Sequence, residues 1–430
     1  MPHDLIIRRV QLRGRAELVD IAIDGGRFTR IAEGIDHTGR EEIDAAGRLA
    51  TEPFVDAHFH IDKSFYGETM GRYRYPLQEL APTGSDFADE PRSGMIEYEQ
   101  FHDNVVPIEA TWAFKRAYTV ADVAERVGRA LRLAVRHGTL AVRMFVDVDS
   151  HAGLTALRGV LHARERFAEI MDLQVCAFPQ EGLATNPRTH DLLTEAIGEG
   201  ADVVGGLPWV EWDDLAAQQH IDFCFELAQK HDLDLHFLCD DTDNPNARTL
   251  ERVAIKALRT GYLGRVSSGH NGALRHYPDV HAAKVIQLVR QAGMSITANA
   301  HVNALGTYTR VPELLRAGVN VCVGQDDLDN FYYPLGRADL LEAVHYTVHL
   351  ARLATPRGFE VAFDIATHNG AKALRLREHG IAEGHPANLQ IFAAANLHQV
   401  IQMNAERNYV ISRGRVVVET RRETAWRWQG

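Results

Sequence analysis

Eight segments in the middle of the chain repeat one pattern, in which a short apolar strand is followed by a turn and then by a helix. A βα unit repeated in this way gives parallel strands, and eight parallel strands close into a barrel. The sequence therefore predicts an α/β fold, a (β/α)8 barrel of the TIM type, with its functional residues at the carboxyl ends of the strands. The strands are expected to start near Pro53, Thr139, Leu173, Ala201, Leu233, Gly264, Met294 and Val319.

One connecting helix shows the local signals. Thr119 with Asp122 three residues later resembles a capping box, and Gly138 stands where a glycine ends a helix. Apolar residues recur between them at helical spacing, at Val123, Val127, Leu131 and Ala134. The segment predicts a helix that packs one face on the barrel.

The two ends of the chain have a different pattern. Short alternating segments flank Gly25–Gly26 near the start and Arg413–Gly414 near the end, and both turns indicate β-hairpins. We therefore expect residues 1–50 and 386–430 to form one small β-sandwich domain, and residues 51–385 to form the barrel.

Composition narrows the function. The formal net charge of -12 argues against a nucleic-acid partner, which needs a basic face. The four cysteines in 430 residues have no C-x-x-C spacing, which favours reduced thiols and a cytoplasmic location. No signal peptide or membrane-length apolar run is visible, so no membrane partner is expected.

The strongest chemical signal is His58-Phe-His60, at the end of the first barrel strand. Residues i and i+2 of a strand point to the same face, so two imidazoles stand together as half of a site for a divalent metal ion. Two packing histidines explain this motif alone about equally well. His270 at the end of strand six and Asp326 at the end of strand eight favour the metal site, because four coincidences at one rim are harder to explain by packing.

The chain resembles the cytosine deaminase-like branch of the amidohydrolase superfamily over nearly its whole length. The resemblance is carried by Phe54–Asp62, Cys176–Gly182, Gly200–Gly205, Cys239–Asp243, Ser268–His270, Asn320–Asp327 and Tyr333–Gly336. It implies a barrel with a β-sandwich from both termini, and hydrolysis of a C–N bond in a small nitrogen heterocycle by a metal-activated water. The implied cofactor is one divalent ion, Zn or Fe, with Mn as a further option, and the implied assembly is a homo-oligomer.

The resemblance also implies roles for single residues. His58, His60, His270 and Asp326 match metal ligands, and Asp326 and His270 also match catalytic residues. Asp241 matches the acid that shuttles protons. Gln180, Asp327 and Tyr332 match substrate-binding positions.

The chain departs from the family motif on the fifth strand. Leu238 stands where the family has its third metal histidine, Asp241 replaces a glutamate, and Phe145 and Gln325 replace two further histidines. His236, on the same strand face as Leu238, and His301, after strand seven, are the imidazoles that can compensate, although a packing role is more common for such residues. The loss of one ligand therefore predicts a lower metal affinity than in the family.

A long segment between His60 and Thr119 contains Tyr66, Tyr73 and Tyr75 and is expected to cover the site, where these rings can stack on a planar substrate. Two alternatives to a deaminase stay open. The first is a hydrolase of the same fold that cleaves an amide, a carbamate or an N-substituted amine. The second is a metal-free barrel that binds a small molecule without hydrolysing it.

Overall fold

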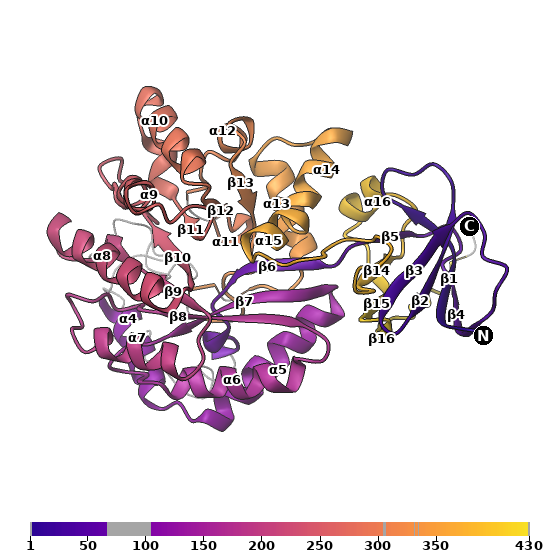
Figure 1. Ribbon diagram of the computed structural model, residues 1–430, viewed down its shortest axis with the longest axis horizontal. Helices are drawn as coiled ribbons and strands as arrows, with labels where there is room; N and C mark the ends of the chain where they lie inside the picture. The colour runs from indigo at the N-terminus through magenta and orange to yellow at the C-terminus, as the bar shows by residue number, and fades with distance from the viewer. Residues whose placement is uncertain (1, 67–104, 304–306, 331, 334, 429–430) are drawn as a thin grey trace.

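Eight parallel strands hydrogen-bond to one another in chain order, and helices cover their outer face (Figure 1). The computed structural model describes residues 2–66, 105–303, 307–330, 332–333 and 335–428. The barrel strands begin within two residues of the predicted starts: β6 Phe54–Phe59, β7 Thr139–Asp147, β8 Asp172–Phe178, β9 Val203–Gly206, β10 Asp234–Cys239, β11 Val266–His270, β12 Ser295–Thr297 and β13 Asn320–Cys322.

The first and last strands meet and close the barrel. The amide of Asp326 donates to the carbonyl of His58 over 2.8 Å, and the amide of His60 donates to the carbonyl of Asp326 over 2.7 Å. The predicted (β/α)8 barrel is thus confirmed, and residues from strand one and strand eight lie side by side at its mouth.

Helices of the barrel follow the strands along the chain. The predicted helix after Thr119 is confirmed as α5, because the Thr119 side chain accepts a hydrogen bond from the amide of Asp122. The helices are α4 Val105–Arg116, α5 Val120–Arg136, α6 Thr155–Phe167, α7 Thr189–Gly198, α8 Asp214–His231, α9 Thr249–Thr260, α10 Asp279–Gln291, α11 Ala300–Asn303, α12 Val311–Arg316, α13 Leu340–Leu350, α14 Pro356–Ile365 and α15 His368–Ala373, with 3-10 turns η1 Ile61–Lys63, η2 Pro208–Val210 and η3 Gly272–His276.

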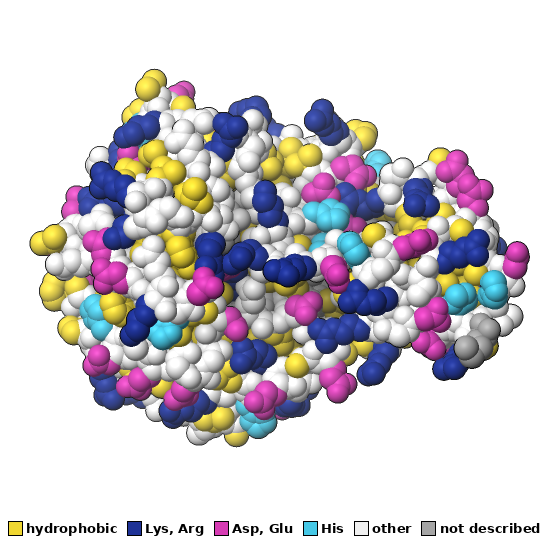
Figure 2. Space-filling view, viewed as in Figure 1, with side chains coloured by type: hydrophobic (Ala, Val, Ile, Leu, Met, Phe, Trp, Pro, Cys, Tyr) yellow, Lys and Arg dark blue, Asp and Glu magenta, His cyan; other side chains and the backbone are white. Residues whose placement is uncertain are grey.

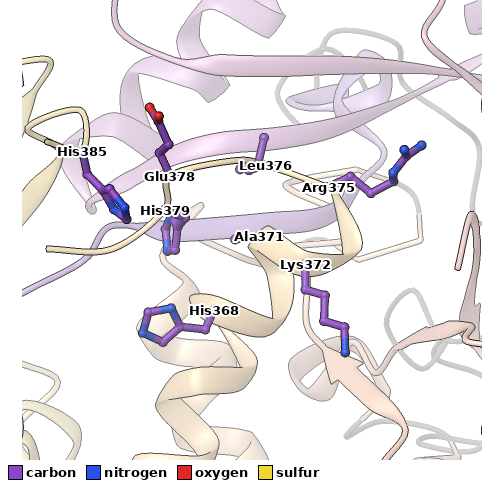
Figure 3. A pocket seen from close by; sticks show the side chains of 8 residues that line it. All are labelled: His368, Ala371, Lys372, Arg375, Leu376, Glu378, His379 and His385. Carbon is purple, nitrogen blue, oxygen red and sulfur yellow. The ribbon is translucent and has the colours of Figure 1, made fainter. Parts of the chain in front are cut away.

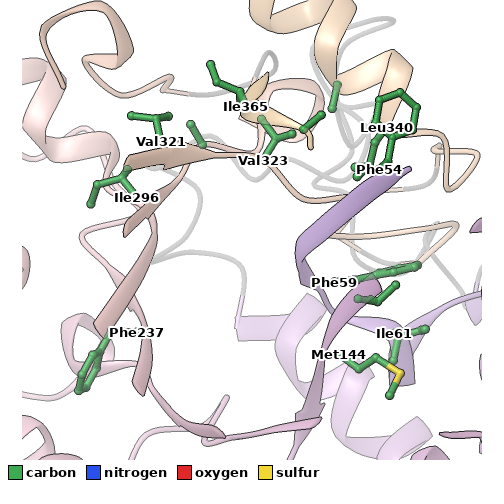
Figure 4. Close-up of a cluster of buried hydrophobic side chains, with 14 of the residues drawn as sticks. Phe54, Phe59, Ile61, Met144, Phe237, Ile296, Val321, Val323, Leu340 and Ile365 are labelled. Atoms are coloured by element: carbon green, nitrogen blue, oxygen red, sulfur yellow. The ribbon is translucent and has the colours of Figure 1, made fainter. Parts of the chain in front are cut away.

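The barrel core is built from strands that are buried on both faces. All nine residues of β7 are buried, as expected for a parallel strand with side chains inside the barrel and helices outside. Figure 4 shows part of this core, in which Phe59 and Met144 from the first two strands lie near Ile61. The interior is therefore close-packed below the mouth, and polar side chains inside it need a specific explanation.

The two ends of the chain form a second sheet, as predicted. Its order is β16-β15-β14-β5-β1-β2-β3, with β4 paired to β1. The strands are β1 His3–Leu12, β2 Val19–Asp24, β3 Arg27–Ala32, β4 Gly39–Asp44, β5 Leu49–Thr51, β14 Leu389–Phe392, β15 Arg407–Ser412 and β16 Arg415–Glu419, and α16 Leu397–Gln402 lies between β14 and β15. The boundaries after residues 50 and 385 stay a prediction.

Charged side chains join the two parts. Arg13, next to β1, forms ion pairs with Glu52 and with Glu360 and Asp364 of α14. Figure 2 shows that lysine, arginine and histidine side chains gather on this face between the barrel and the smaller sheet. None of the described helices has the length and apolar character needed to cross a membrane.

Candidate active site

Two imidazoles face each other at the end of the first barrel strand. His58 lies in β6 and His60 directly follows it, and the Nε2 atoms of the two rings are 3.2 Å apart. Both side chains are almost completely buried. The alternation of the strand therefore brings the two rings together inside the barrel mouth, as the sequence indicates.

A carboxylate and a third imidazole complete the cluster. Asp326 Oδ1 lies 3.3 Å from Nε2 of His58 and 3.7 Å from Nε2 of His60, and Asp326 Oδ2 lies 3.5 Å from Nε2 of His270. Asp326 and His270 both have a positive φ, 61° and 64°, an uncommon conformation for these residues. Strained backbone of this kind persists where the surroundings hold it, often at functional sites.

The donor atoms are spaced like the ligands of one ion. A Zn–N bond is about 2.0–2.1 Å long, so two ligands of a tetrahedral ion are about 3.3–3.4 Å apart. The measured separations of 3.2, 3.3, 3.5 and 3.7 Å lie around that value. His60 Nδ1 and Asp326 Oδ2 are buried without a hydrogen-bond partner among the described residues. The donor atoms of His58, His270 and Asp326 all lie within 4.8 Å of one another, so these three residues fit a divalent metal ion, and His60 lies beside them through its contacts with His58 and Asp326.

The charges of the cluster suit a cation. Burial lowers the pKa of His58 and lowers that of His60 well below the usual value, so both rings are neutral and their lone pairs are free to bind a metal. Burial acts to raise the pKa of Asp326, but the charge of His270 and the contact with His58 outweigh it, and the pKa is lowered. Neutral imidazoles and an ionised carboxylate are the ligands that zinc or iron prefers.

His270 connects two carboxylates. Its Nδ1 lies 3.4 Å from Asp241 Oδ1, on the opposite edge of the ring from Asp326. Burial acts to lower the pKa of His270, but the neighbouring carboxylates, Asp241 first, outweigh it and raise the pKa. The Asp241 side chain is 38% exposed, so it stands at the open side of the cluster.

The three predicted substrate-binding residues lie around the same mouth. Gln180 Oε1 accepts a hydrogen bond of 3.4 Å from Lys63 Nζ, and since a lysine ammonium only donates, the carbonyl end of the Gln180 amide is the end that faces Lys63. Asp327 accepts a hydrogen bond from Asn330, and burial raises its pKa to about 8. Burial also raises the pKa of Tyr332, which lies close enough to Lys63 for their charges to interact.

Neither compensating histidine reaches the cluster as a ligand. His236 Nε2 lies 3.4 Å from Nδ1 of His58, the ring edge that faces away from Asp326. His301 Nε2 contacts the carbonyl oxygen of Gln325. His236 thus supports a candidate ligand from below, and His301 is held by the loop after β13.

An apolar wall lies beside the cluster, at the positions where the resemblance leads one to expect further imidazoles. Leu238 packs in a cluster with Phe145 and Phe178, and Phe145 lies 4.0 Å from the His58 ring centroid and 5.1 Å from that of His60. The other members are Cys176, Val203 and Leu207, with Trp209 and Val210 packed against them. One side of the candidate metal site is therefore lined by aliphatic and aromatic carbon.

Sequence reasoning missed a buried network of lysines and carboxylates beside Gln180. Lys63 pairs with Asp147 at the end of β7, and Lys115 of α4 pairs with Asp147, Asp149 and Glu181. The signal for Lys63 was its place two residues after Ile61 in the first-strand motif. Lys115 carries no local signal, because only the fold brings its helix to the mouth.

Of the three tyrosines expected to cover the site, Tyr73 and Tyr75 lie outside the described residues. Tyr66 is buried rather than exposed at a loop tip. Its ring stacks on Phe114 at 5.4 Å, and the Arg126 guanidinium lies over it at 5.0 Å. The idea that Tyr66 stacks on a substrate is therefore not supported, because its faces are already used.

A separate cavity of about 470 Å³ lies at the other end of the barrel (Figure 3). Arg375, which lines it, pairs with Asp234, the first residue of β10, whereas the candidate ligands lie at the ends of their strands. The other lining residues are His368, Ala371, Lys372, Leu376, Glu378, His379 and His385. This cavity is not part of the candidate active site.

Comparisons with known proteins agree with the geometry. A model of the amidohydrolase family matches residues 41–418. The chain is 30% identical to N-isopropylammelide isopropyl amidohydrolase of Pseudomonas sp. (strain ADP), over 97% of each protein. It is 27% identical to pterin deaminase of Rhizobium rhizogenes, over 85% of this chain and 79% of that protein. The structure of 5-methylcytosine deaminase from Klebsiella pneumoniae, liganded with phosphonocytosine, superposes with a TM-score of 0.86 and 30% identity over 99% of this chain and all of that one.

Proposed function

Because the chain belongs to the amidohydrolase family and is a metal-dependent hydrolase of C–N bonds, we propose that it is an aminohydrolase that removes an amino group from a small nitrogen heterocycle. Relatives named for hydrolysis of an ammelide, deamination of a pterin and deamination of 5-methylcytosine support this substrate class. A small-molecule substrate also agrees with the acidic net charge. The four cysteines are unpaired, which supports a cytoplasmic location.

The observation that carries the proposal is the cluster of His58, His270 and Asp326 at the barrel mouth, with His60 beside it. His58, His60, His270 and Asp326 would hold one divalent ion, zinc or iron, since their donors are nitrogen and oxygen at the spacing of a single first coordination shell. A divalent ion bound there would lower the pKa of a water molecule, so that the water can lose a proton and attack a carbon at neutral pH.

The protein residues then move protons. Asp326 Oδ2, which has no hydrogen-bond partner among the described residues, accepts the proton of the attacking water. Asp241, at the open side, donates a proton to the departing nitrogen. His270 lies 3.5 Å from Asp326 and 3.4 Å from Asp241, so it stabilises the negative charge that develops between them.

Gln180, Asp327 and Tyr332 would hold the heterocycle. With its carbonyl turned to Lys63, the Gln180 amide offers its N–H groups to a ring carbonyl or an unprotonated ring nitrogen. Asp327, with its pKa raised to about 8 by burial, is protonated at neutral pH and can donate a hydrogen bond as well. The site therefore favours a substrate edge that is rich in acceptors, as in hydroxylated or oxo-substituted azines.

The apolar wall favours a second candidate within the same class, the hydrolysis of an N-alkylated amine. Leu238, Phe145 and Phe178 offer no hydrogen bond to a departing amino group but do offer carbon contacts to an alkyl substituent. The relative from Pseudomonas is named for the removal of an isopropyl-substituted amine. Both candidates use the same metal site and differ only in the leaving group.

The test is turnover of a substrate panel by the purified, metal-loaded protein. Cytosine, 5-methylcytosine, a pterin and N-isopropylammelide are incubated with it, and the release of ammonia or of alkylamine is measured by mass spectrometry. Release of either amine from one heterocycle supports the proposal, and Asp326→Asn should lower the rate by at least about 100-fold while the protein stays folded.

Metal analysis separates the enzyme from a metal-free binding barrel. About one equivalent of Zn, Fe or Mn in the purified or reconstituted protein is expected, and His58→Ala should lower it. A protein that takes up no divalent ion and releases no amine from any heterocycle would exclude the proposed reaction and leave small-molecule binding as the function.

A further inference from the structure

We propose that Lys115 is a positioning residue for the substrate, which acts through Asp147 and Lys63 on the Gln180 amide. The inference rests on the proposed function, because Gln180 reads the heterocycle there. It goes beyond that function by giving a role in substrate recognition to a helix that contributes no residue to the metal cluster.

Lys115 is a buried cation held by three carboxylates. Its side chain is 1% exposed, and its Nζ lies 2.8 Å from Asp147 Oδ2, 2.8 Å from Asp149 Oδ2 and 2.7 Å from Glu181 Oε1. The contacts with Asp149 and Glu181 are hydrogen bonds and the contact with Asp147 is an ion pair, so three carboxylates surround the ammonium group. Because the Lys115 ammonium group is buried among these carboxylates, its effect on a substrate passes through them.

Asp147 links Lys115 to Lys63, because its carboxylate contacts the ammonium groups of both lysines. Its Oδ2 forms an ion pair with Lys115 and its Oδ1 accepts a hydrogen bond from Lys63, so each oxygen of one carboxylate faces one ammonium group. Lys63 in turn donates to Gln180 Oε1 over 3.4 Å. Both lysines and Asp147 are at most 1% exposed, so water does not replace a lost contact.

Because both lysines contact the Asp147 carboxylate, the presence of Lys115 determines the strength of the hydrogen bond from Lys63 to Gln180. With Lys115 present, Asp147 divides its negative charge between two cations, and Lys63 keeps an N–H for the glutamine. Without Lys115, Lys63 is the remaining lysine that pairs with Asp147 among the described residues, and the neighbouring Asp149 and Glu181 add uncompensated negative charge. Lys63 is then drawn toward the carboxylates and away from Gln180, whose amide loses its fixed orientation.

Other contacts already hold α4 in place, so anchoring this helix does not require Lys115. Trp112 stacks on His151 with ring centroids 4.6 Å apart, and Phe114 stacks on Tyr66 at 5.4 Å. A buried lysine surrounded by three carboxylates is costly to desolvate, and apolar residues of similar volume often give equal stability. The arrangement thus points to a functional use of the charge.

The experiment uses the best substrate from the panel and compares steady-state kinetics of four proteins: wild type, Lys115→Met, Glu181→Gln, and the charge-balanced double variant Lys115→Met/Glu181→Gln. The double variant removes one positive and one negative charge, so it carries the test if Lys115→Met alone does not fold. We expect both Lys115 variants to raise KM by about tenfold, the loss of one hydrogen bond from Gln180 to the substrate, with a smaller change in kcat. Glu181→Gln is the matched control and should keep KM within about twofold, because Lys115, Asp147 and Lys63 remain linked.

A double-mutant cycle tests whether Lys115 acts on the substrate through Gln180. In a Gln180→Leu background, replacing Lys115 by Met should change kcat/KM no further, because the amide that Lys115 orients is already gone. A general loss of structure would instead lower kcat/KM in both backgrounds, and the unfolding midpoint of each variant is measured alongside.

Three results would overturn the inference: a folded double variant with wild-type KM, an equal loss in Glu181→Gln, or additive effects of Lys115 and Gln180. If wild type turns over a heterocycle and one of these results appears, only the role of Lys115 is wrong. If wild type turns over no heterocycle at all, the proposed function fails, and the role of Lys115 fails with it.

Discussion

At the scale of single residues, the position of Leu238 raises a direct question about metal binding. The cluster has His58, His60, His270 and Asp326 as donors, and Leu238 ends an apolar wall beside them. Four protein ligands occupy all positions of a tetrahedral ion, so they leave less room for a reactive water. If the resemblance to the family holds at this position, Leu238 puts carbon surface where a further metal ligand is expected.

Leu238→His tests this trade. The substitution adds an imidazole on β10 next to the cluster, and we expect the dissociation constant for Zn²⁺ to fall by about tenfold or more, since one added first-shell ligand has an effect of that order. The affinity is measured by competition with a chromophoric chelator. Leu238→Asn is the control, because it is polar and has no imidazole. Equal affinities of wild type and Leu238→His would show that this position does not face the ion.

Contacts between residues close together in the sequence could be predicted, whereas contacts between distant residues could not. His58 and His60 are two residues apart on one strand, so a simple strand rule predicts that their rings meet. The contact of Lys115 with Glu181 joins residues 66 positions apart, and no periodicity encodes it. The stacking of Tyr66 on Phe114 was missed for the same reason.

At the scale of elements, the close approach of β6 and the end of β13 shapes the site. Gly324 follows β13, and a Cβ atom built on it would lie 2.3 Å from the carbonyl oxygen and 2.7 Å from the amide nitrogen of His58. No side chain fits there without moving one strand, so glycine is required by space alone. The seam between the first and last strands is thus as tight as backbone atoms allow.

Gly324→Ala should therefore damage both the fold and the metal site. We expect the free energy of unfolding to fall by about 1–3 kcal/mol, as in other overpacked sites, and the affinity for Zn²⁺ to fall as His58 is displaced. Gly198→Ala in α7 is the matched control, since its added Cβ meets nothing within 4 Å and alanine favours a helix. Urea unfolding and chelator competition measure the two effects. A Gly324→Ala protein with wild-type stability would show that the seam can open.

The elements themselves were largely predictable. The strand starts followed from apolar runs bounded by turns, and the end of α5 followed from Gly138, which has a φ of 83°. The β4 strand, which pairs in parallel with β1, was not expected, because its exposed residues Arg40, Glu41 and Glu42 show no apolar alternation. Local patterns predict an element only where one of its faces is buried.

At the scale of the whole molecule, the junction between barrel and sheet contains a titratable group with a large shift. Burial lowers the pKa of His379 to about 4 from its usual value of 6.5, and the neighbouring His368 and His385 act in the same direction, while Glu52 opposes them. Between pH 6.5 and pH 4, the His379 ring is therefore protonated in the unfolded chain but stays neutral in the folded protein. Stability from the neutral ring is complete above pH 6.5 and is lost as the pH falls toward 4.

His379→Gln should flatten this pH dependence. The variant keeps a polar side chain of similar size but takes up no proton, so its free energy of unfolding should change less between pH 6.5 and pH 4, by up to about 3 kcal/mol relative to wild type. Chemical unfolding at several pH values in that window measures the difference. Parallel curves for the two proteins would mean that His379 is solvated in the folded state.

The general arrangement of the molecule was predictable because each part repeats one rule. Hairpin signals at both ends predicted one sheet from the two termini, and the βα repeat predicted the barrel. The network of Arg13 with Glu52, Glu360 and Asp364 was not predictable, because it joins charged residues that look like ordinary surface side chains in the sequence.

The closure of the barrel has a consequence for protein synthesis. His58 and Asp326 belong to strands that leave the ribosome first and last among the eight, and their backbones bond only when the ring is shut. A nascent chain that still lacks the last barrel strand contains His58 and His60 but not Asp326, which contacts them in the folded protein. An ion held by this cluster would therefore stabilise only chains in which the first and last strands have met.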